Sequence, residues 1–505
     1  MSTRFAPRPA VPPATPPTIG RRLPAAWSCA LAVLLAACAA TPPHPAPELA
    51  LPGHYLHQQG WQTATPAAVA AAQRQGSEAT DGPAAWWQVY QDAALDAVLA
   101  EVTLRNATLE QAAAQWRQAE AAVAAARASR YPQLDGTASA NRSGSSGRSA
   151  SADGAPQSRF AAGLSASWMP DVWGRLALGQ QAAQASADAA AAELAAVRLA
   201  LQLSAAEQYV SLRRLELDAR LLAQTRTAYQ RSLLLTRNQY DSGFVARADV
   251  IQAQIQLESV QAQIAANQHQ QALARNALAL LAGSTPGQWQ APGSHDVPLQ
   301  EPPAIPARIV SALLLQRPDI AAAAGQLAAA NAQLGLAQTA WLPDLSLSAS
   351  AGLQASRWSD FIDAPLRVWS LGPALAASLF DGGARRAATA QAEAAYQARA
   401  AAWRASVLQA VQEVEDALAA AQWLQAQHTH QLTLLQLADE NLRVVQNQYE
   451  AGLVSYLDVA TAQNLALGSQ RNALDLQAQR LQASMQLIAA LGGGWQVPRT
   501  ASIHP

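Results

Sequence analysis

Two long parts of the chain have the apolar spacing of amphipathic helices. No proline interrupts residues 171–285 or 374–497. Within both stretches apolar residues recur every three or four positions, as an amphipathic helix requires. Examples are Leu194, Val197, Leu201, Ala205, Tyr209 and Leu212, and then Val407, Val411, Val414, Leu418 and Ala421. Helices from Arg175 to Tyr240 and from Arg385 to Tyr449 would each reach roughly 100 Å. Such rods predict a helical tube or bundle.

Four shorter segments alternate with a period of two and predict strands in two hairpins, 133–170 and 343–380. The segments run from Gln133 to Asn141, Phe160 to Trp168, Leu345 to Gln354 and Trp369 to Leu379. Apolar residues on one face and polar residues on the other are typical of outer-membrane barrels, although soluble amphipathic hairpins give the same pattern. Two hairpins cannot close a barrel, so membrane-spanning strands would require several chains to share one. Tryptophans near the strand ends would then lie at the membrane interfaces: Trp168, Trp358 and Trp369.

The chain repeats itself. QYDSGFVARADVIQAQ begins at Gln239, and QYEAGLVSYLDVATAQ begins 209 positions later (448 − 239). Similar offsets relate Pro132 to Pro343 (343 − 132 = 211) and Asp171 to Asp381 (381 − 171 = 210). Each half therefore has the order helix, hairpin, long helix, turn and helix, which indicates an internal duplication.

These patterns divide the chain into six parts. We expect a signal peptide, a lipidated N-terminal segment, a first repeat with its tip turn at 240–248, a Pro-rich linker, a second repeat with its tip turn at 449–457, and a tail. The corresponding residues are 1–37, 38–91, 92–283, 284–307, 308–492 and 493–505.

Composition excludes several kinds of protein. Charged residues make up 14% and the net charge is −1, so no basic surface for nucleic acid is expected. No nucleophile, phosphate-loop or cysteine motif occurs. His428 and His430 are two positions apart and cannot share a helix face as metal ligands usually do. We therefore expect no enzyme activity and no cofactor other than a lipid.

The N-terminus has the features of an export signal. Arg21 and Arg22 precede an apolar run that is too short to span a bilayer comfortably and ends in Leu-Ala-Ala-Cys38. This ending resembles the bacterial lipobox, which implies that Cys38 carries a covalent lipid and becomes the first residue. Ala39 follows it, which by resemblance to enterobacterial lipoproteins favours the outer membrane. Cleavage of an ordinary signal peptide near Ala40 is the alternative.

Together these motifs resemble the TolC-like outer-membrane efflux proteins, in particular the lipidated NodT/OprM type. The motifs are the lipobox, the duplicated halves, Arg317-Pro-Asp319, Asp171-Val-Trp-Gly-Arg175, Phe380-Asp-Gly-Gly383 and the two Gln-Tyr-x-x-Gly turns. The resemblance implies a mixed α and β membrane protein. Its homotrimer would form one twelve-stranded barrel, with four strands per chain, continued by a periplasmic α-helical barrel.

The resemblance also implies a function and partners. The protein would be the exit duct of a tripartite efflux system, lipid-anchored in the outer membrane, spanning it and extending into the periplasm. Its partners would be a periplasmic adaptor and an inner-membrane pump, which we expect to be of the resistance-nodulation-division type. Type I secretion or heavy-metal efflux is an alternative use of the duct. A periplasmic coiled-coil adaptor or structural lipoprotein is an alternative of another class.

The two Gln-Tyr-x-x-Gly turns are candidate adaptor-docking tips. Gly243 and Gly452 would adopt positive φ and let another backbone approach, and the adjacent Val245 and Val454 would contribute to docking. Ordinary helix capping explains the same glycines.

A periplasmic gate is expected beside these turns. The resemblance implies that Asp458 rings the closed aperture and that Tyr449 helps to hold it shut, with Asp249 and Tyr240 as their counterparts in the first half. Ser455-x-x-Asp458 also fits a helix capping box, which would require no gating role.

Overall fold

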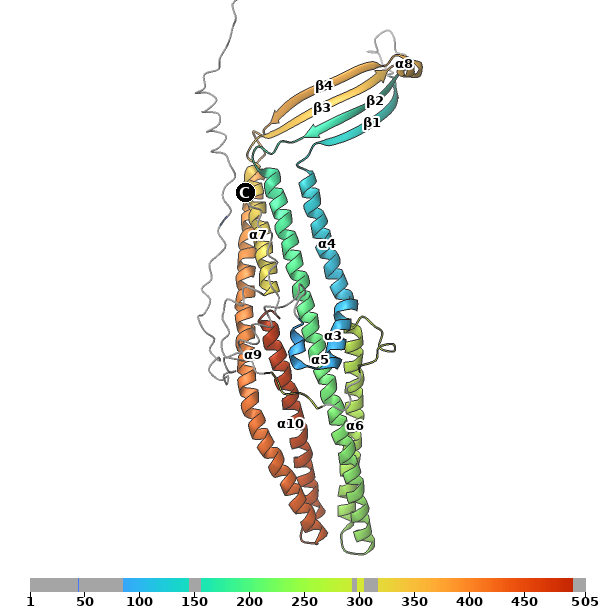
Figure 1. Cartoon of the computed structure of the whole chain (residues 1–505), viewed down its shortest axis with the longest axis vertical. Helices are drawn as coiled ribbons and strands as arrows, with labels where there is room; N and C mark the ends of the chain where they lie inside the picture. The colour runs from blue at the N-terminus through green and yellow to red at the C-terminus, as the bar shows by residue number, and fades with distance from the viewer. Residues whose placement is uncertain (1–43, 45–84, 145–155, 293–297, 304–316, 494–505) are drawn as a thin grey trace, which may run out of the picture.

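Long helices carry a small sheet at one end of the molecule. The computed structural model describes residues 44, 85–144, 156–292, 298–303 and 317–493. Figure 1 shows the sheet at the top and two helical hairpins that end in tight turns at the bottom. The described chain is therefore mostly helical, with one four-stranded antiparallel sheet.

The sheet has the order β1-β2-β3-β4, and every neighbouring pair is antiparallel. Its strands are β1 (Gln133–Ser143), β2 (Gln157–Trp168), β3 (Asp344–Ala355) and β4 (Leu366–Ala376). The expected fourth strand, Trp369 to Leu379, was placed three residues too late. Trp358 lies in a short helix, α8 (Trp358–Asp363), and Trp369 lies within β4 instead of near its end.

The register separates an apolar face of the sheet from a polar one. Leu164 pairs with Ala351, and Ala351 pairs with Trp369, so these three side chains share a face. The next rung, Ser165, Ser350 and Ser370, lies on the opposite face, where the hydroxyls of Ser350 and Ser370 are 2.9 Å apart. Leucines and the tryptophan on the first face are largely exposed: Leu134, Leu164, Trp369, Leu371 and Leu375.

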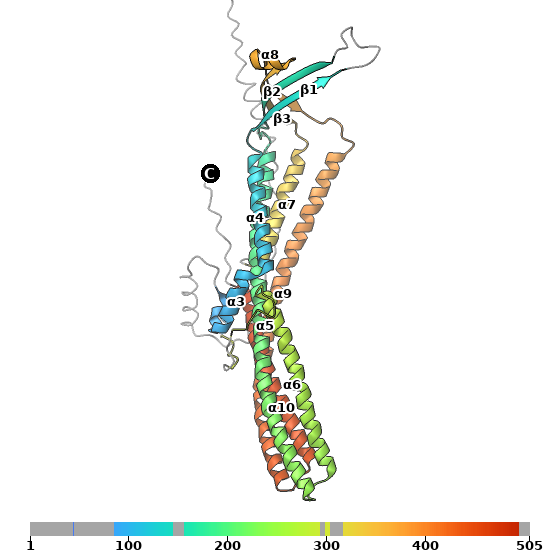
Figure 2. The ribbon, with the colours of Figure 1, turned by 90° about the vertical axis from the view of Figure 1, so that its right-hand side faces the viewer.

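The helices form matched pairs from the two halves of the chain. α4 (Ala107–Ala128) and α7 (Pro318–Thr339) each have 22 residues. The long helices α5 (Arg175–Asp241) and α9 (Ala384–Glu450) each have 67, and the returning helices α6 (Arg247–Leu281) and α10 (Tyr456–Ala490) each have 35. At about 1.5 Å per residue, α5 and α9 each extend roughly 100 Å. Figure 2 shows α5, α6 and α10 running side by side toward the tip turns.

An aspartate caps each long helix where it leaves the sheet. Asp171 accepts hydrogen bonds from the backbone N–H groups of Leu176 and Ala177 at the start of α5. Asp381 accepts from the backbone N–H of Arg385 and from its Nε, at 2.6 Å, at the start of α9. A carboxylate stabilises the first turn of a helix because the N–H groups there have no partner within the helix.

A second junction joins the end of each returning helix to the start of an ascending one. Asn106 caps α4 and donates through Nδ2 to the carbonyl of Leu281, the last residue of α6, at 2.8 Å. Arg317 precedes α7 and donates through Nη1 to the carbonyl of Ala490, the last residue of α10, at 2.9 Å. The Arg-Pro-Asp motif is thus the counterpart of this asparagine (317 − 106 = 211).

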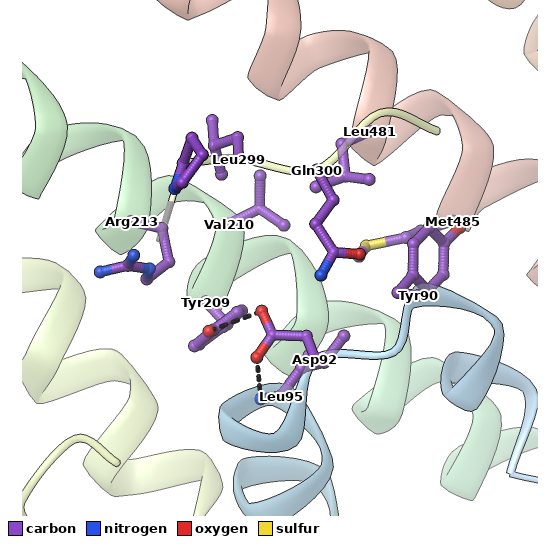
Figure 3. A pocket seen from close by; sticks show the side chains of 11 residues that line it. Tyr90, Asp92, Leu95, Tyr209, Val210, Arg213, Leu299, Gln300, Leu481 and Met485 are labelled. Carbon is purple, nitrogen blue, oxygen red and sulfur yellow. Dashed lines mark hydrogen bonds between the residues drawn. The ribbon is translucent and has the colours of Figure 1, made fainter. Parts of the chain in front are cut away.

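The largest buried core lies midway along the helices. It combines apolar side chains of η2 (Trp86–Tyr90), α3 (Ala93–Arg105), α5, α6, α10 and the linker residue Leu299. Asp92 caps α3 and accepts a hydrogen bond from the hydroxyl of Tyr209 at 2.8 Å, and the hydroxyl of Tyr90 lies 2.9 Å from that of Ser484. Figure 3 shows Tyr90, Asp92 and Tyr209 around a narrow cavity that Leu299 and Gln300 border. This core, here called the equatorial core, fixes both halves to each other.

Below the equatorial core the two hairpins, α5–α6 and α9–α10, meet through two buried apolar clusters and through polar groups of α5 and α10. Arg471 donates to the carboxylate of Asp218 through Nε at 2.8 Å and through Nη2 at 3.0 Å. Arg214 and Asp475 form a looser pair at 3.5 Å. Asp218 is 2% exposed and also accepts from Asn267 of α6 at 2.9 Å. The buried carboxylate of Asp218 therefore connects three helices.

Candidate functional site

Both tip turns end their helices in the same way. After α5, the N–H of Gly243 donates to Tyr240 and that of Phe244 donates to Gln239, each at 2.9 Å. After α9, Gly452 donates to Tyr449 and Leu453 donates to Gln448, again at 2.9 Å. These bonds form a Schellman motif, which requires a left-handed residue. Gly243 has φ +77° and Gly452 has φ +73°, as expected from the sequence.

Both glycines have free space at the position of a side chain. A Cβ placed on Gly243 or on Gly452 would meet no atom within 4 Å. The close approach of another backbone is therefore not made within the described chain. The space into which each Cβ would point is therefore open within the described chain.

The exposed apolar residues of the tips are not the expected valines. Val245 and Val454 are half-buried, and Val454 packs against a buried cluster between the tips. Phe244 is 83% exposed and Leu453 is 75% exposed. These two residues occupy equivalent positions (453 − 244 = 209), which is a signal that the sequence already contained. Each tip thus presents one large apolar side chain directly after its glycine.

The carboxylates Asp249 and Asp458 cap the helices that follow the turns. Asp458 accepts from the backbone N–H of Ser455 at 3.0 Å and from its hydroxyl at 2.7 Å. Asp249 accepts from the backbone N–H of Ala246 at 3.2 Å. The capping interpretation of Asp458 is confirmed, and its carboxylate remains exposed to solvent.

Tyr449 is buried inside its own chain. Its hydroxyl donates to Oε1 of Gln239 at 2.7 Å and lies 3.1 Å from the hydroxyl of Thr236, so it connects α9 to α5. Its ring meets that of Tyr456 edge to face, with the centroids 5.6 Å apart. Burial raises the pKa of Tyr449, the Thr236 hydrogen bond lowers it, and the nearby Asp249 carboxylate raises it. Burial also raises the pKa of Tyr456 to about 12, so both phenols remain protonated at neutral pH.

The structure does not bring the four expected gate residues together. A groove between the tips is bordered by Asp249 and Tyr449, together with Phe244, Gly452 and Val454. Asp458 and Tyr240 are not among the residues that border it, and Tyr240 is 43% exposed at the end of α5. The two halves therefore differ. Tyr449 connects the two hairpins, whereas Tyr240 is largely exposed to solvent.

The expected lipid attachment site, Cys38, lies outside the described residues. Within the described ranges, no group of three or more His, Cys, Asp or Glu side chains is placed to hold a metal ion. His428 instead lies 3.1 Å from Arg480, through Nδ1.

Comparison with known proteins places this architecture in a family. The family model for outer membrane efflux protein matches residues 98–284 and 309–493. The chain is 32% identical to the cation efflux system protein CusC of Escherichia coli O6:H1, over 82% of this chain and 89% of that protein. It is 31% identical to the pyoverdine export outer membrane protein OpmQ of Pseudomonas aeruginosa, over 92% and 96%.

Solved structures give the same assignment. The crystal structure of the outer membrane protein VceC from Vibrio cholerae superimposes with a TM-score of 0.74 and 32% identity, covering 82% of this chain and all of that one (100%). The expected resemblance is thereby confirmed. The chain belongs to the outer membrane efflux protein family, and it is a protein of the outer membrane.

Proposed function

We propose that this protein is the exit duct of a tripartite efflux system. One observation carries the proposal: a four-stranded sheet with an apolar face lies at one end of helices roughly 100 Å long, and tight tips lie at the other end. The sheet would contribute to a membrane barrel, and the helices would extend the duct across the periplasm.

The proposed assembly is a homotrimer. Within the described chain β1 pairs only with β2, and β4 pairs only with β3, so both outer strands have an unpaired edge. An unpaired edge is not tolerated in lipid, because its N–H and C=O groups find no water there. Three copies would join β4 of one chain to β1 of the next and close a barrel of about twelve strands. The leucine face would meet lipid and the serine face would line the pore.

Two adjacent residues of β4 test the barrel. Leu371→Arg places a charge on the proposed lipid face, which costs about 2–4 kcal/mol near the bilayer centre. It should therefore greatly reduce the heat-sensitive trimer that gel electrophoresis detects in membranes. Ser370→Arg, on the opposite face, should assemble normally. Equal assembly of both variants would contradict the assignment of faces, and a monomeric wild-type protein by light scattering in detergent would contradict the trimer.

At the other end, the tips would dock a periplasmic adaptor, and the adaptor would connect the duct to an inner-membrane pump of the resistance-nodulation-division type. The open space beside Gly243 and Gly452, together with exposed Phe244 and Leu453, supports docking there. We retain Asp458, Asp249, Tyr449 and Tyr240 as proposed gate residues. In the closed trimer, three copies of Asp458 would attract cations at the constriction.

The cargo is left open. Relatives of nearly equal similarity carry different names, a cation efflux protein at 32% identity and a pyoverdine exporter at 31%. Overall similarity therefore favours neither cargo for this chain.

Cys38 is the proposed lipid attachment site, because it ends the apolar run and is the only cysteine after residue 29. Cys38→Ser should abolish incorporation of a radioactive fatty acid and leave the signal peptide attached. N-terminal sequencing of the wild-type protein should find a blocked residue. A labelled Cys38→Ser protein, or a free N-terminus near Ala40, would show that the lipobox assignment is wrong.

A further inference from the structure

Buried polar atoms lie in the contact between α5 and α10, between the tips and the Asp218–Arg471 pair. The hydroxyls of Tyr229 and Tyr456 and Oε1 of Gln463 are buried and have no hydrogen-bond partner in the part of the chain that the structure describes. The three residues are 3%, 0% and 3% exposed. Tyr229 belongs to α5, whereas Tyr456 and Gln463 belong to α10, so both helical hairpins contribute. Figure 2 shows these two helices side by side along this part of the molecule.

Several observations place these groups close together. Tyr456 and Gln463 are seven residues apart, or about two helical turns, and therefore share a face of α10. Nε2 of Gln463 donates to the hydroxyl of Ser232 at 3.4 Å, and Ser232 lies one turn after Tyr229 on α5. Burial raises the pKa of Tyr456, and the nearby phenol of Tyr229 raises it further. The Ser232 hydroxyl lowers it, but from a position that does not meet the distance and angle of a hydrogen bond.

Buried atoms of this kind need a partner. A donor or acceptor that leaves water without a replacement hydrogen bond costs free energy, so buried polar groups are nearly always bonded to protein or to ordered water. An internal water typically makes about three hydrogen bonds, and three atoms without a protein partner converge here. Tyr456 also borders the groove between the tips, so the site lies beside a region that solvent can enter.

The chemistry of the three atoms defines what can bind. The carboxamide oxygen of Gln463 only accepts, whereas each phenol can donate one hydrogen bond and accept others. A single water can donate to the amide and to one phenol and accept from the other. Burial raises the pKa of Tyr229 and of Tyr456 to about 12 each, so both phenols are protonated at neutral pH. The three groups therefore carry no charge and suit a neutral molecule better than a cation.

We propose that a bound water molecule, here called the interhairpin water, joins Tyr229 of α5 to Tyr456 and Gln463 of α10. The proposal goes beyond the duct function and does not depend on it. The interhairpin water adds a polar link between the two buried apolar clusters at the contact of the hairpins. It is a part of that contact that both repeats build together.

Removing one hydroxyl at a time tests the link. Tyr229→Phe and Tyr456→Phe each leave the ring in place but deprive the water of one partner. Backbone amides of α10 around Gln463 should then exchange hydrogen about ten-fold faster, as measured by mass spectrometry at equal trimer abundance. If the hydroxyls had no partner at all, their removal would relieve a penalty and slow the exchange. Exchange at or below the wild-type rate in both variants would therefore overturn the proposal.

Tyr131→Phe is the matched control. Tyr131 is 60% exposed and lies outside the hairpins, so this variant should leave exchange in α10 unchanged. The double variant Tyr229→Phe/Tyr456→Phe tests whether one water serves both phenols. Its exchange should accelerate by clearly less than the roughly hundred-fold product of two independent effects, because the second substitution acts on a site that has already lost its water. An acceleration equal to the full product would show that the phenols do not share a partner.

A crystal structure at a resolution that reveals ordered water identifies the occupant. The wild-type protein should show a density peak within hydrogen-bond distance of Tyr229 and of Tyr456 or Gln463, and the double variant should lack it. Direct hydrogen bonds among the three side chains, without such a peak, would refute the interhairpin water. Crystals grown in rubidium chloride distinguish an ion, because an anomalous signal at the peak would assign the site to a cation and would also refute the proposal.

Discussion

A Gly452→Trp protein is expected to assemble at wild-type abundance and to lose most of its export. The strain of a left-handed tryptophan costs roughly 1–2 kcal/mol, and the tip is held by a separate buried cluster that includes Tyr449, Tyr456 and Val459. No described atom lies within 4 Å of a Cβ at this position, so the indole would project into open space. That space is where we propose that the adaptor docks. Loss of about 1.4 kcal/mol or more of docking free energy would lower binding at least ten-fold.

Gly452→Ala is the matched control for this substitution. It introduces the same backbone strain but almost no bulk, so it should export close to normally. Export should be measured as survival or efflux rate at equal trimer abundance, with adaptor capture measured in parallel. Normal export by the tryptophan variant would refute docking at this tip. Equal loss of export in both variants would mean that the backbone conformation of Gly452, and not the free space beside it, is required for export.

Asp218→Ala is expected to loosen the contact between the two helical hairpins below the equatorial core. The substitution removes the carboxylate that accepts from Arg471 of α10 and from Asn267 of α6. Breaking a fully buried ion pair costs about 3–5 kcal/mol. Arg471 is 39% exposed and can be rehydrated, so we expect roughly 2–3 kcal/mol. The trimer should dissociate at a lower temperature, and the single-channel conductance in planar bilayers should rise because the α9–α10 hairpin can move away from α5.

Asp475→Ala provides the comparison on the same pair of helices. Its partner Arg214 is 3.5 Å away, and the two side chains are 46% and 26% exposed, so the pair should contribute no more than about 1 kcal/mol. If both variants conducted alike, the Asp218–Arg471 pair would not control the separation of the hairpins.

The helices could be predicted from the sequence because their pattern is long and local. Apolar residues at steps of three and four, without proline, define α5 and α9 almost to the residue. The strands were found from their alternation, but β4 was displaced because Leu371, Leu375 and Leu379 share one face and continue it past the strand end. Leu379 is 95% exposed in the turn that follows. Periodicity identifies a face of a strand and does not mark where the strand stops.

The packing of the tips could not be predicted from the sequence because it depends on contacts between distant segments. Nothing local distinguishes Tyr449, which is 6% exposed, from its counterpart Tyr240, which is 43% exposed. The difference arises because the hydroxyl of Tyr449, in the second half of the chain, hydrogen-bonds with Thr236 and Gln239 of α5, in the first half. The predicted docking residues also included Val245 and Val454 but not Phe244 and Leu453, which directly follow the two glycines and are exposed. The repeat itself, read position by position, would have identified them.

The equal lengths of the paired helices restrict how this protein can change in evolution. α5 and α9 have 67 residues each, and α6 and α10 have 35 each, so both tips end at the same level. One residue inserted in α5 alone would advance its tip by about 1.5 Å and rotate every following side chain by about 100°. Insertions are therefore tolerated only when they enter both arms of a hairpin and both repeats together, in steps near a heptad. The length of the helical part is therefore fixed unless matching insertions occur in both repeats.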